Sequence, residues 1–289
     1  MFTNLIEPAQ LAALDPARVR IIDARHDLAQ PDAGRQAWRQ SRIPGAIFLH
    51  ADDDLAGSPR HGAGRHPLPE REAFHQRMVE AGIAEDMPVV VYDAQGGVMA
   101  SRLWWMLRWI GHRPVAVLNG GWQAWQAAGL PVDAAAPLSR AGLPGPAAQP
   151  LKLKVALTGQ VSVHEVLHNL EQPRWVVVDA RAAPRYRGEI EPLDPVAGHI
   201  PGAINRPQSL NLQDDGRFKA PAQLRDEFLA LLGSRAPETV VHQCGSGISA
   251  CHNLLAMEVA GLAGSRLYPG SWSEWCSDPS RPVARGPQP

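Results

Sequence analysis

Short apolar runs of strand length alternate with apolar segments of helix length along most of the chain. The short runs are continuous, which is typical of strands that are buried on both faces of a mainly parallel sheet. The predicted strands are residues 21–22, 89–91, 115–118, 176–178 and 240–241, and the predicted helices include 101–110 and 250–259. The pattern therefore predicts an α/β fold. In such folds the functional site lies at the carboxyl ends of the strands.

The same sequence landmarks occur twice in the same order, which indicates an internal duplication. Ile-Ile-Asp-Ala-Arg at 21–25 returns as Val-Val-Asp-Ala-Arg at 177–181, and Ile-Pro-Gly-Ala-Ile at 43–47 returns at 200–204. A β-rich run ends at Asp93 in the first copy and at Cys244 in the second, and Gly-Gly-Trp at 120–122 corresponds to Gly-Ser-Trp at 270–272. Four landmarks with nearly constant offsets are hard to explain by chance.

We therefore predict two tandem domains, 1–134 and 151–289, each a mainly parallel sheet flanked by helices. The segment 135–150 is rich in small residues, proline and glycine, and it is predicted to be a linker. The length of 289 residues fits two domains. Lys and Arg number 28 and Asp and Glu number 29, so the net charge of −1 offers no basic surplus for nucleic acid.

The N-terminus has neither a basic region nor the apolar stretch of a signal peptide, and apolar runs such as 89–92 are far shorter than a membrane span. Three cysteines cannot build a disulfide framework, which favours a reducing compartment. We therefore expect a cytoplasmic protein with neither membrane nor nucleic acid as a partner.

The candidate chemistry is concentrated in the loop that begins at Cys244. The predicted strand 240–243 runs into Cys-Gly-Ser-Gly-Ile-Ser at 244–249, and the predicted helix 250–259 follows at once. Two glycines allow a tight turn with inward-pointing N–H groups, and the helix start adds further unpaired donors. Such a loop favours the thiolate form of its cysteine and binds an anion beside the sulfur. The pattern predicts sulfur nucleophilic chemistry.

The first copy has Asp93 in place of Cys244, so we predict that only the second domain is catalytic. Cys251 and Cys276 are interpreted as packing residues. No two cysteines have the spacing of a metal-ligand pair, so we expect no metal site and no cofactor.

These motifs resemble the tandem-domain sulfurtransferases of the rhodanese and 3-mercaptopyruvate sulfurtransferase family. The resemblance covers nearly the whole chain and rests on Asp-Ala-Arg at 179–181, Gly-His-Ile-Pro-Gly-Ala at 198–203, the loop at 244–249 and Tyr-Pro-Gly-Ser-Trp-Ser-Glu-Trp at 268–275. It implies that Cys244 takes the sulfane sulfur of a small-molecule donor as a persulfide and passes it to an acceptor such as a thiol, cyanide or a reduced thioredoxin. Backbone N–H groups from Gly245 through Gly247 and Ile248 to Ser249 would stabilise the persulfide.

The resemblance leaves two donors open. Thiosulfate-type members carry basic residues inside the loop, whereas Cys-Gly-Ser-Gly-Ile-Ser is similar to the mercaptopyruvate-type loop Cys-Gly-Ser-Gly-Val-Thr. For that type the resemblance implies that Ser246, His66 and Asp52 handle protons. Asp52 is equally well interpreted as a solvated carboxylate of a turn.

Substrate arginines point less clearly to one donor. Arg185 matches the first of the two arginines that mercaptopyruvate-type members use to bind the donor, but Leu193-Asp194 follows Glu191-Pro192 where the second is expected. Thiosulfate-type members also lack that second arginine. Arg187 is interpreted as an exposed arginine in a salt bridge rather than as a substitute. The loop sequence favours 3-mercaptopyruvate, with thiosulfate:cyanide transfer as the alternative.

Two further classes of protein share part of this pattern. Cysteine-dependent phosphatases also place a cysteine in a strand–loop–helix cradle, but they need an arginine six positions later, where this chain has Ala250. A persulfide carrier that delivers sulfur to a protein acceptor is compatible with the same loop.

Overall fold

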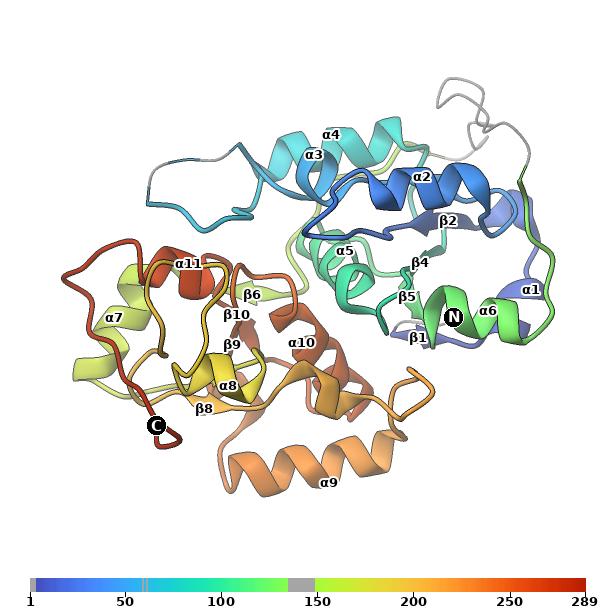
Figure 1. Ribbon diagram of the computed structural model, residues 1–289. Coiled ribbons are helices and arrows are strands. Elements are labelled where there is room, and N and C mark those ends of the chain that lie inside the picture. The colour runs from blue at the N-terminus through green and yellow to red at the C-terminus, as the bar shows by residue number, and fades with distance from the viewer. Residues whose placement is uncertain (1–3, 59, 61, 135–148) are drawn as a thin grey trace. The chain divides into compact units, whose positions relative to one another are not determined.

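The computed structural model describes residues 4–58, 60, 62–134 and 149–289, which form two compact units (Figure 1). Unit 1 comprises Met1–Gly57, Leu68–Leu157 and Asp214–Phe218, and unit 2 comprises Ser58–Pro67, Thr158–Gln213 and Lys219–Pro289, with the undescribed residues excepted. Most of the predicted linker, residues 135–148, lies outside the described residues. The short segment Ser58–Pro67 belongs to unit 2, although it precedes most of unit 1 in the sequence.

Unit 1 contains a parallel five-stranded sheet in the order β1-β5-β4-β2-β3. Its strands are β1 (Leu5–Ile6), β2 (Arg20–Asp23), β3 (Ile47–Phe48), β4 (Val89–Tyr92) and β5 (Val115–Leu118). Its helices are α1 (Pro8–Ala12), the 3₁₀ turn η1 (Pro16–Arg18), α2 (Ala33–Gln40), α3 (Ala51–Leu55), α4 (Arg71–Glu80), α5 (Val98–Trp109) and α6 (Gly121–Ala127).

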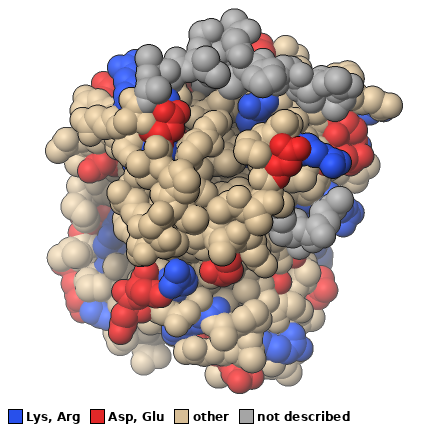
Figure 2. Space-filling model, turned by 90° about the vertical axis from the view of Figure 1, so that its right-hand side faces the viewer, with Lys and Arg blue, Asp and Glu red and all other residues tan. Residues whose placement is uncertain are grey.

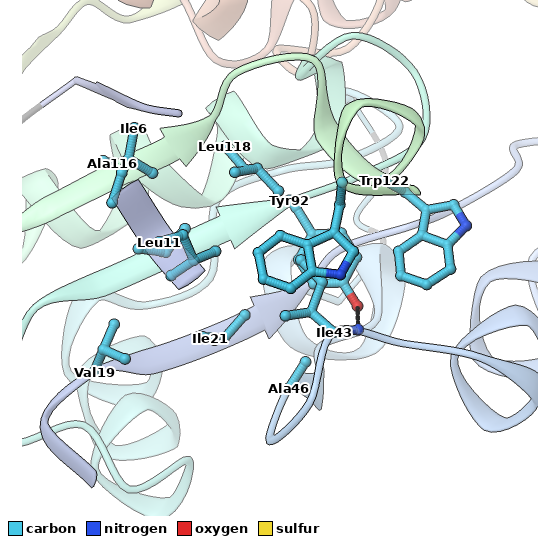
Figure 3. Packing of buried hydrophobic residues seen from close by; sticks show 12 residues of the cluster. Ile6, Leu11, Val19, Ile21, Ile43, Ala46, Tyr92, Ala116, Leu118 and Trp122 are labelled. Carbon is cyan, nitrogen blue, oxygen red and sulfur yellow. Dashed lines mark hydrogen bonds between the residues drawn. The ribbon is translucent and has the colours of Figure 1, made fainter. Parts of the chain in front are cut away.

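The two faces of this sheet are covered by different helices. Alternate strand residues such as Val90 and Tyr92 pack with Trp122 of α6 and Leu11 of α1 on one face (Figure 3). The long apolar helix α5 contacts β4 and β5, and the alternation of side chains places it on the other face. Burial on both faces explains why the central strands read as continuous apolar runs.

Unit 2 repeats this architecture in the order β6-β10-β9-β7-β8, again with all strands parallel. Its strands are β6 (Gly159–Gln160), β7 (Val176–Asp179), β8 (Ile204–Asn205), β9 (Val240–Gln243) and β10 (Arg266–Leu267). Its helices are α7 (Val163–Glu171), α8 (Ala183–Tyr186), the 3₁₀ turns η3 (Gln208–Asn211) and η4 (Pro237–Thr239), α9 (Pro221–Leu232), α10 (Ala250–Val259) and α11 (Ser271–Trp275). These two sheets confirm the predicted α/β class.

In unit 2, α10 covers β9 and β10 on one face, and α9 packs against α10. The opposite face is covered by apolar side chains of α7, α8 and α11. Trp272 and Trp275 of α11 are fully buried in this cluster, so they are core residues. The carboxyl ends of β7 and β9 are neighbours, because Asp179 pairs with Gln243 in the register of the two strands.

The face drawn in Figure 2 carries charges of both signs. On the face drawn in Figure 2, the described Lys and Arg side chains are interspersed with Asp and Glu and form no continuous basic patch. Within the described part of the chain, none of the helices combines the length and the apolar character needed to span a membrane.

Candidate active site

Cys244 directly follows β9, at the carboxyl end of the sheet in unit 2. Its side chain is buried, with the residue 2% exposed. Its N–H donates to Ser271 Oγ over 3.0 Å, and its carbonyl accepts the N–H of Trp272 over 3.0 Å. The carbonyl of Gly245 accepts the N–H of Ser273 over 2.9 Å. The segment after β10 therefore fixes the backbone on which the sulfur sits.

The loop after Cys244 leaves several backbone donors available. Within the described residues, the N–H groups of Ser246, Ile248 and Ser249 make no hydrogen bond to the protein. Gly247 has a φ of 79°, and a Cβ there would lie only 2.2 Å from the carbonyl oxygen of Pro269, so this turn requires glycine. Unpaired N–H groups that precede the N-terminus of α10 are the kind of donors that can bind an anion next to the sulfur.

Ser271 supports this loop from a strained backbone. Its φ of 56° lies in the left-handed region, where a serine costs about 1 kcal/mol or more. Its hydroxyl accepts the Cys244 N–H and donates to the carbonyl of Tyr268 over 2.9 Å. Ser271 therefore fixes the backbone position of Cys244. The Gly-Ser-Trp motif at 270–272 offered the signal, but sequence analysis did not assign it this role.

Ser246 and His66 are brought together in unit 2. His66 Nδ1 lies 2.7 Å from Ser246 Oγ, and Ser246 is 5% exposed. The two residues are 180 positions apart in the sequence. The contact forms because the segment Ser58–Pro67 packs with unit 2. A hydroxyl that is hydrogen-bonded to an imidazole can pass a proton to or from a group at the loop.

Arg185 of α8 lies beside the loop. Its Nε and Nη2 donate to the Glu191 carboxylate over 3.2 and 2.6 Å, and its Nη1 makes no hydrogen bond within the described residues. A Cβ built on Gly245 would lie 3.6 Å from Arg185 Nη1. Glu191 therefore fixes one edge of the guanidinium, and the other edge reaches the first residue after the nucleophile. As predicted, Arg187 instead pairs with Glu189 over 2.7 Å, with its side chain one-third exposed.

Arg65 also reaches the loop, although the sequence gave no reason to single it out. A Cβ on Gly245 would lie 2.9 Å from Arg65 Nη2. Arg65 Nη1 pairs with the buried carboxylate of Asp194, which also lies 3.5 Å from Arg185 Nη2. Asp194 thus connects the two arginines, in the stretch after Glu191-Pro192 where an arginine had been expected. Local pattern could not reveal this, because Arg65 is distant in sequence.

A third arginine lies deeper and joins the sheet to this network. Arg181 donates through Nη2 to Asp179 over 2.7 Å, contacts Glu191 at 3.3 Å and stacks over the Trp272 ring at 4.7 Å. Burial disfavours its charge, but Asp179, Glu191 and Cys244 together raise the pKa of Arg181 above its ordinary value. In the same network, Arg185 and Arg181 outweigh burial and lower the pKa of Glu191. Both shifts favour the charged forms of Arg181 and Glu191.

Asp52 lies in unit 1, at the start of α3. It lies 3.9 Å from His26 Nε2 and 3.9 Å from His50 Nδ1. The potential ligand atoms of these three residues lie within 4.8 Å of one another, the spacing of a possible metal site. However, His50 Nδ1 accepts the N–H groups of Asp52 and Asp53 as the cap of α3, so one potential ligand is already engaged. Burial lowers the pKa of His26, which keeps its ring neutral.

The three cysteines are buried, and none of them forms a disulfide. Cys251 lies in α10, and its Sγ is 3.4 Å from the carbonyl oxygen of Gly247 in the preceding loop. Cys276 packs in the core of unit 2. Burial, reinforced by the charge of Asp194, raises the pKa of the Cys276 thiol to about 11, so it stays protonated at neutral pH. Cys251 and Cys276 are therefore packing residues, whereas Cys244 begins the loop with unpaired N–H groups.

Comparisons with known proteins agree with this geometry. The model of the rhodanese-like domain matches the chain twice, at residues 8–128 and 162–278. The chain is 44% identical over 288 residues to a Pseudomonas aeruginosa protein named "Probable 3-mercaptopyruvate sulfurtransferase", with 98% of each chain covered. It is 34% identical over 278 residues to a thiosulfate sulfurtransferase from Bos taurus, with 94% of this chain and 89% of that protein covered.

A solved structure gives the same result at the level of the fold. The 3-mercaptopyruvate sulfurtransferase from Leishmania major superposes with a TM-score of 0.81 and 33% identity, covering 94% of this chain and 74% of that one. Two matched domains, a relative aligned along nearly the whole chain and the strand–loop–helix around Cys244 all point to one family. The protein therefore belongs to the rhodanese family, among the tandem-domain sulfurtransferases.

Proposed function

We propose that the protein moves a sulfane sulfur from a small anionic donor, with 3-mercaptopyruvate favoured, through a persulfide on Cys244 to a thiophilic acceptor. The observation that carries this proposal is the position of Cys244 at a loop with unpaired N–H donors and the Arg185 guanidinium next to it. The first domain, with Asp93 in place of the cysteine, does not carry sulfur.

In the first step, the Cys244 thiolate attacks the sulfur of the donor. A new S–S bond forms, the C–S bond of 3-mercaptopyruvate breaks, and its electron pair leaves on the methylene carbon as the enolate of pyruvate. The proton of the donor thiol ends on that carbon, so the products are a Cys244 persulfide anion and pyruvate. The N–H groups of Ser246, Ile248 and Ser249, with those of Gly245 and Gly247, are placed to stabilise the persulfide.

Ser246 and His66 are suited to the proton transfer of this step. The Ser246 hydroxyl can hydrogen-bond to the developing enolate oxygen, and His66 holds that hydroxyl from its other side over 2.7 Å. Thiosulfate needs no such proton, because its leaving group is sulfite. The pair therefore supports 3-mercaptopyruvate as the donor. Asp52 is kept as a proposed third member on the family resemblance alone.

In the second step, the acceptor attacks the outer sulfur and releases the Cys244 thiolate. With cyanide the product is thiocyanate, and with a thiol the product is a persulfide on the acceptor. A thioredoxin-like protein or another protein acceptor would use the same chemistry, so the persulfide-carrier alternative shares this step. Three thiols that form no disulfide fit the reducing environment of the cytoplasm, which we propose as the location.

The direct test is mass spectrometry of the protein after incubation with 3-mercaptopyruvate or with thiosulfate. We expect one added sulfur on the peptide that contains Cys244. Cys251→Ser and Cys276→Ser are matched controls that should keep this mass shift. Unchanged turnover in Cys244→Ser would contradict the proposal.

The choice of donor is tested by measuring kcat/KM with both donors in Ser246→Ala and His66→Gln. We expect losses of about 10²-fold or more with 3-mercaptopyruvate and much smaller losses with thiosulfate. Equal losses with both donors would remove the argument for 3-mercaptopyruvate.

A further inference from the structure

We infer that Arg65 is the second donor-binding arginine of this enzyme and forms, with Arg185, a site for the carboxylate of an α-keto acid donor. The inference rests on the proposed function, because it names the group that binds the donor of that reaction. It also explains how the site could bind a donor although Leu193 and Asp194 follow Glu191-Pro192, where the second arginine was expected.

The guanidinium groups of Arg185 and Arg65 both reach Gly245, the first residue after Cys244. Arg185 uses Nε and Nη2 to bind Glu191, and Arg65 uses Nη1 to bind Asp194. Within the described residues, Arg185 Nη1 and Arg65 Nη2 have no hydrogen-bond partner. These two nitrogens lie 3.6 and 2.9 Å from the position that a Cβ on Gly245 would take. Two unpaired N–H edges therefore converge over the residue after the nucleophile.

Arg65 is held in place by its backbone as well as by its side chain. Its N–H donates to Ser273 Oγ over 3.0 Å, and the N–H of Ser273 donates to the carbonyl of Gly245 over 2.9 Å. A Cβ on Gly64 would lie 2.5 Å from the carbonyl oxygen of Gly270, so only glycine permits the close approach of this segment. Ser273 therefore connects the backbone of Arg65 to Gly245 of the loop.

The charges and the solvent exposure of these side chains also suit the binding of an anion. Asp194 is buried, with its side chain 3% exposed, whereas the side chains of Arg65 and Arg185 are 30% and 17% exposed. The carboxylates hold the arginines from the protein side, and the guanidinium groups remain partly accessible from solvent. Charge-assisted hydrogen bonds from two guanidinium groups match the oxygens of a carboxylate. A carboxylate held there would bring the rest of a small donor to Cys244.

The test compares Arg65→Ala with Arg187→Ala, a matched control whose guanidinium pairs with Glu189. Loss of one charge-assisted contact should raise KM for 3-mercaptopyruvate and the inhibition constant of pyruvate by about 10- to 100-fold. It should leave kcat within a few-fold, and saturating donor should still produce the Cys244 persulfide. Arg65→Lys keeps the charge but not the planar geometry, so it should recover only part of the loss. Arg187→Ala should behave as the unmodified protein.

The possible outcomes separate this inference from the proposed function. An unchanged KM and pyruvate inhibition in Arg65→Ala, with persulfide formed, would overturn the role of Arg65 alone. A fall in kcat without a rise in KM would assign Arg65 only the structural task of holding the His66 segment, and would also overturn it. Absence of a persulfide in the unmodified protein with either donor would overturn the proposed function itself. Should Arg65→Ala fail to fold, Arg65→Gln and Asp194→Asn test the same contact, and a normal KM in both would contradict it.

Discussion

Both halves of the chain contain the same strand–loop–helix, but the loop differs in what its backbone N–H groups bind. In unit 1 the Asp93 carboxylate fills its own loop, where Oδ1 accepts the N–H groups of Gln95 and Gly97 over 2.9 Å. Its Oδ2 accepts those of Met99 and Ala100 over 2.7 and 2.9 Å. The first loop thus contains a covalently attached anion, which demonstrates that this geometry binds negative oxygens through the backbone.

Unit 2 has the corresponding loop without an internal anion. Cys244 replaces Asp93, and the loop before α10 is one residue longer than the loop before α5. The N–H groups of Ser246, Ile248 and Ser249 are unpaired within the described residues. The comparison teaches that a loop filled by its own carboxylate is structural, whereas the longer loop with a cysteine in that place keeps its N–H groups available for a ligand.

The largest expected effect comes from substitutions at Cys244 and at Asp93, its counterpart in unit 1. Cys244→Ser should lower turnover by about 10⁴-fold or more, because no other group forms the persulfide. Adding Asp93→Cys to that variant should not restore activity, because Ala29 occupies the position after Asp-Ala-Arg that corresponds to Arg185. Turnover assays with 3-mercaptopyruvate check this. Restored activity would show that the cysteine alone decides which copy is catalytic.

The next effect is on stability and concerns unit 1. Asp93→Ala removes the acceptor of four backbone N–H groups and should lower the free energy of unfolding by about 3 kcal/mol. Cys244→Ala removes no such acceptor and should cost only about 1 kcal/mol. Urea denaturation measures both values. Similar losses in the two variants would contradict the view that Asp93 is structural and Cys244 is not.

A third effect compares the response of the two units to acid. Burial lowers the pKa of His112 in unit 1 to about 4 and that of His242 in unit 2 to about 3. The unfolded chain therefore binds these protons first, and stability present above pH 6.5 is lost as the pH falls toward 4. Each histidine should account for a loss of about 2 kcal/mol between pH 7 and pH 5.

The measurement is the free energy of unfolding as a function of pH in His112→Phe and His242→Phe. In each variant the free energy of unfolding should fall less steeply below pH 6.5, by the amount that the replaced histidine contributes. A slope that remains unchanged in both would show that carboxylates alone cause the acid sensitivity.

The smallest expected effect concerns the residue that holds the loops. Ser271 and Gly121 occupy matching positions with φ values of 56° and 57°. Ser271→Gly removes about 1 kcal/mol of backbone strain and also the acceptor of the Cys244 N–H, so stability should change little while kcat falls several-fold. Gly121→Ser, in contrast, should lower stability by at least about 1 kcal/mol, because its Cβ would lie 2.4 Å from the carbonyl oxygen of Asp93. Kinetics and urea denaturation test the pair, and an unchanged kcat in Ser271→Gly would remove its positioning role.

The predicted elements that agree with the structure are those buried on both faces. The continuous runs at 89–91 and 176–178 lie in β4 and β7, and the predicted helix 250–259 coincides with α10. The two-residue strands β1 and β6 were not predicted, because so short a segment has no period of its own. Pairing with a neighbouring strand is what makes them part of a sheet.

The residues of the site also divide into those that the sequence pointed to and those that only the structure revealed. The sequence pointed to Cys244 and its glycine loop because strand, nucleophile, turn and helix are contiguous, and family resemblance pointed to Arg185, Ser246 and His66. Nothing local marks Arg65, since it lies in a segment without apolar periodicity. Ser271 resembles any serine until its positive φ and its bond to the Cys244 N–H are seen.

By itself the sequence determined that the chain is a duplication, that its two sheets are parallel and that one copy has kept a cysteine at the strand end. These properties follow from local spacing and from burial, which leave a periodic trace in the sequence. Only the tertiary structure decided which cations stand over Gly245 and which imidazole meets Ser246. Those contacts depend on where the segment Ser58–Pro67 packs, and long-range packing of an irregular segment leaves no periodic signal.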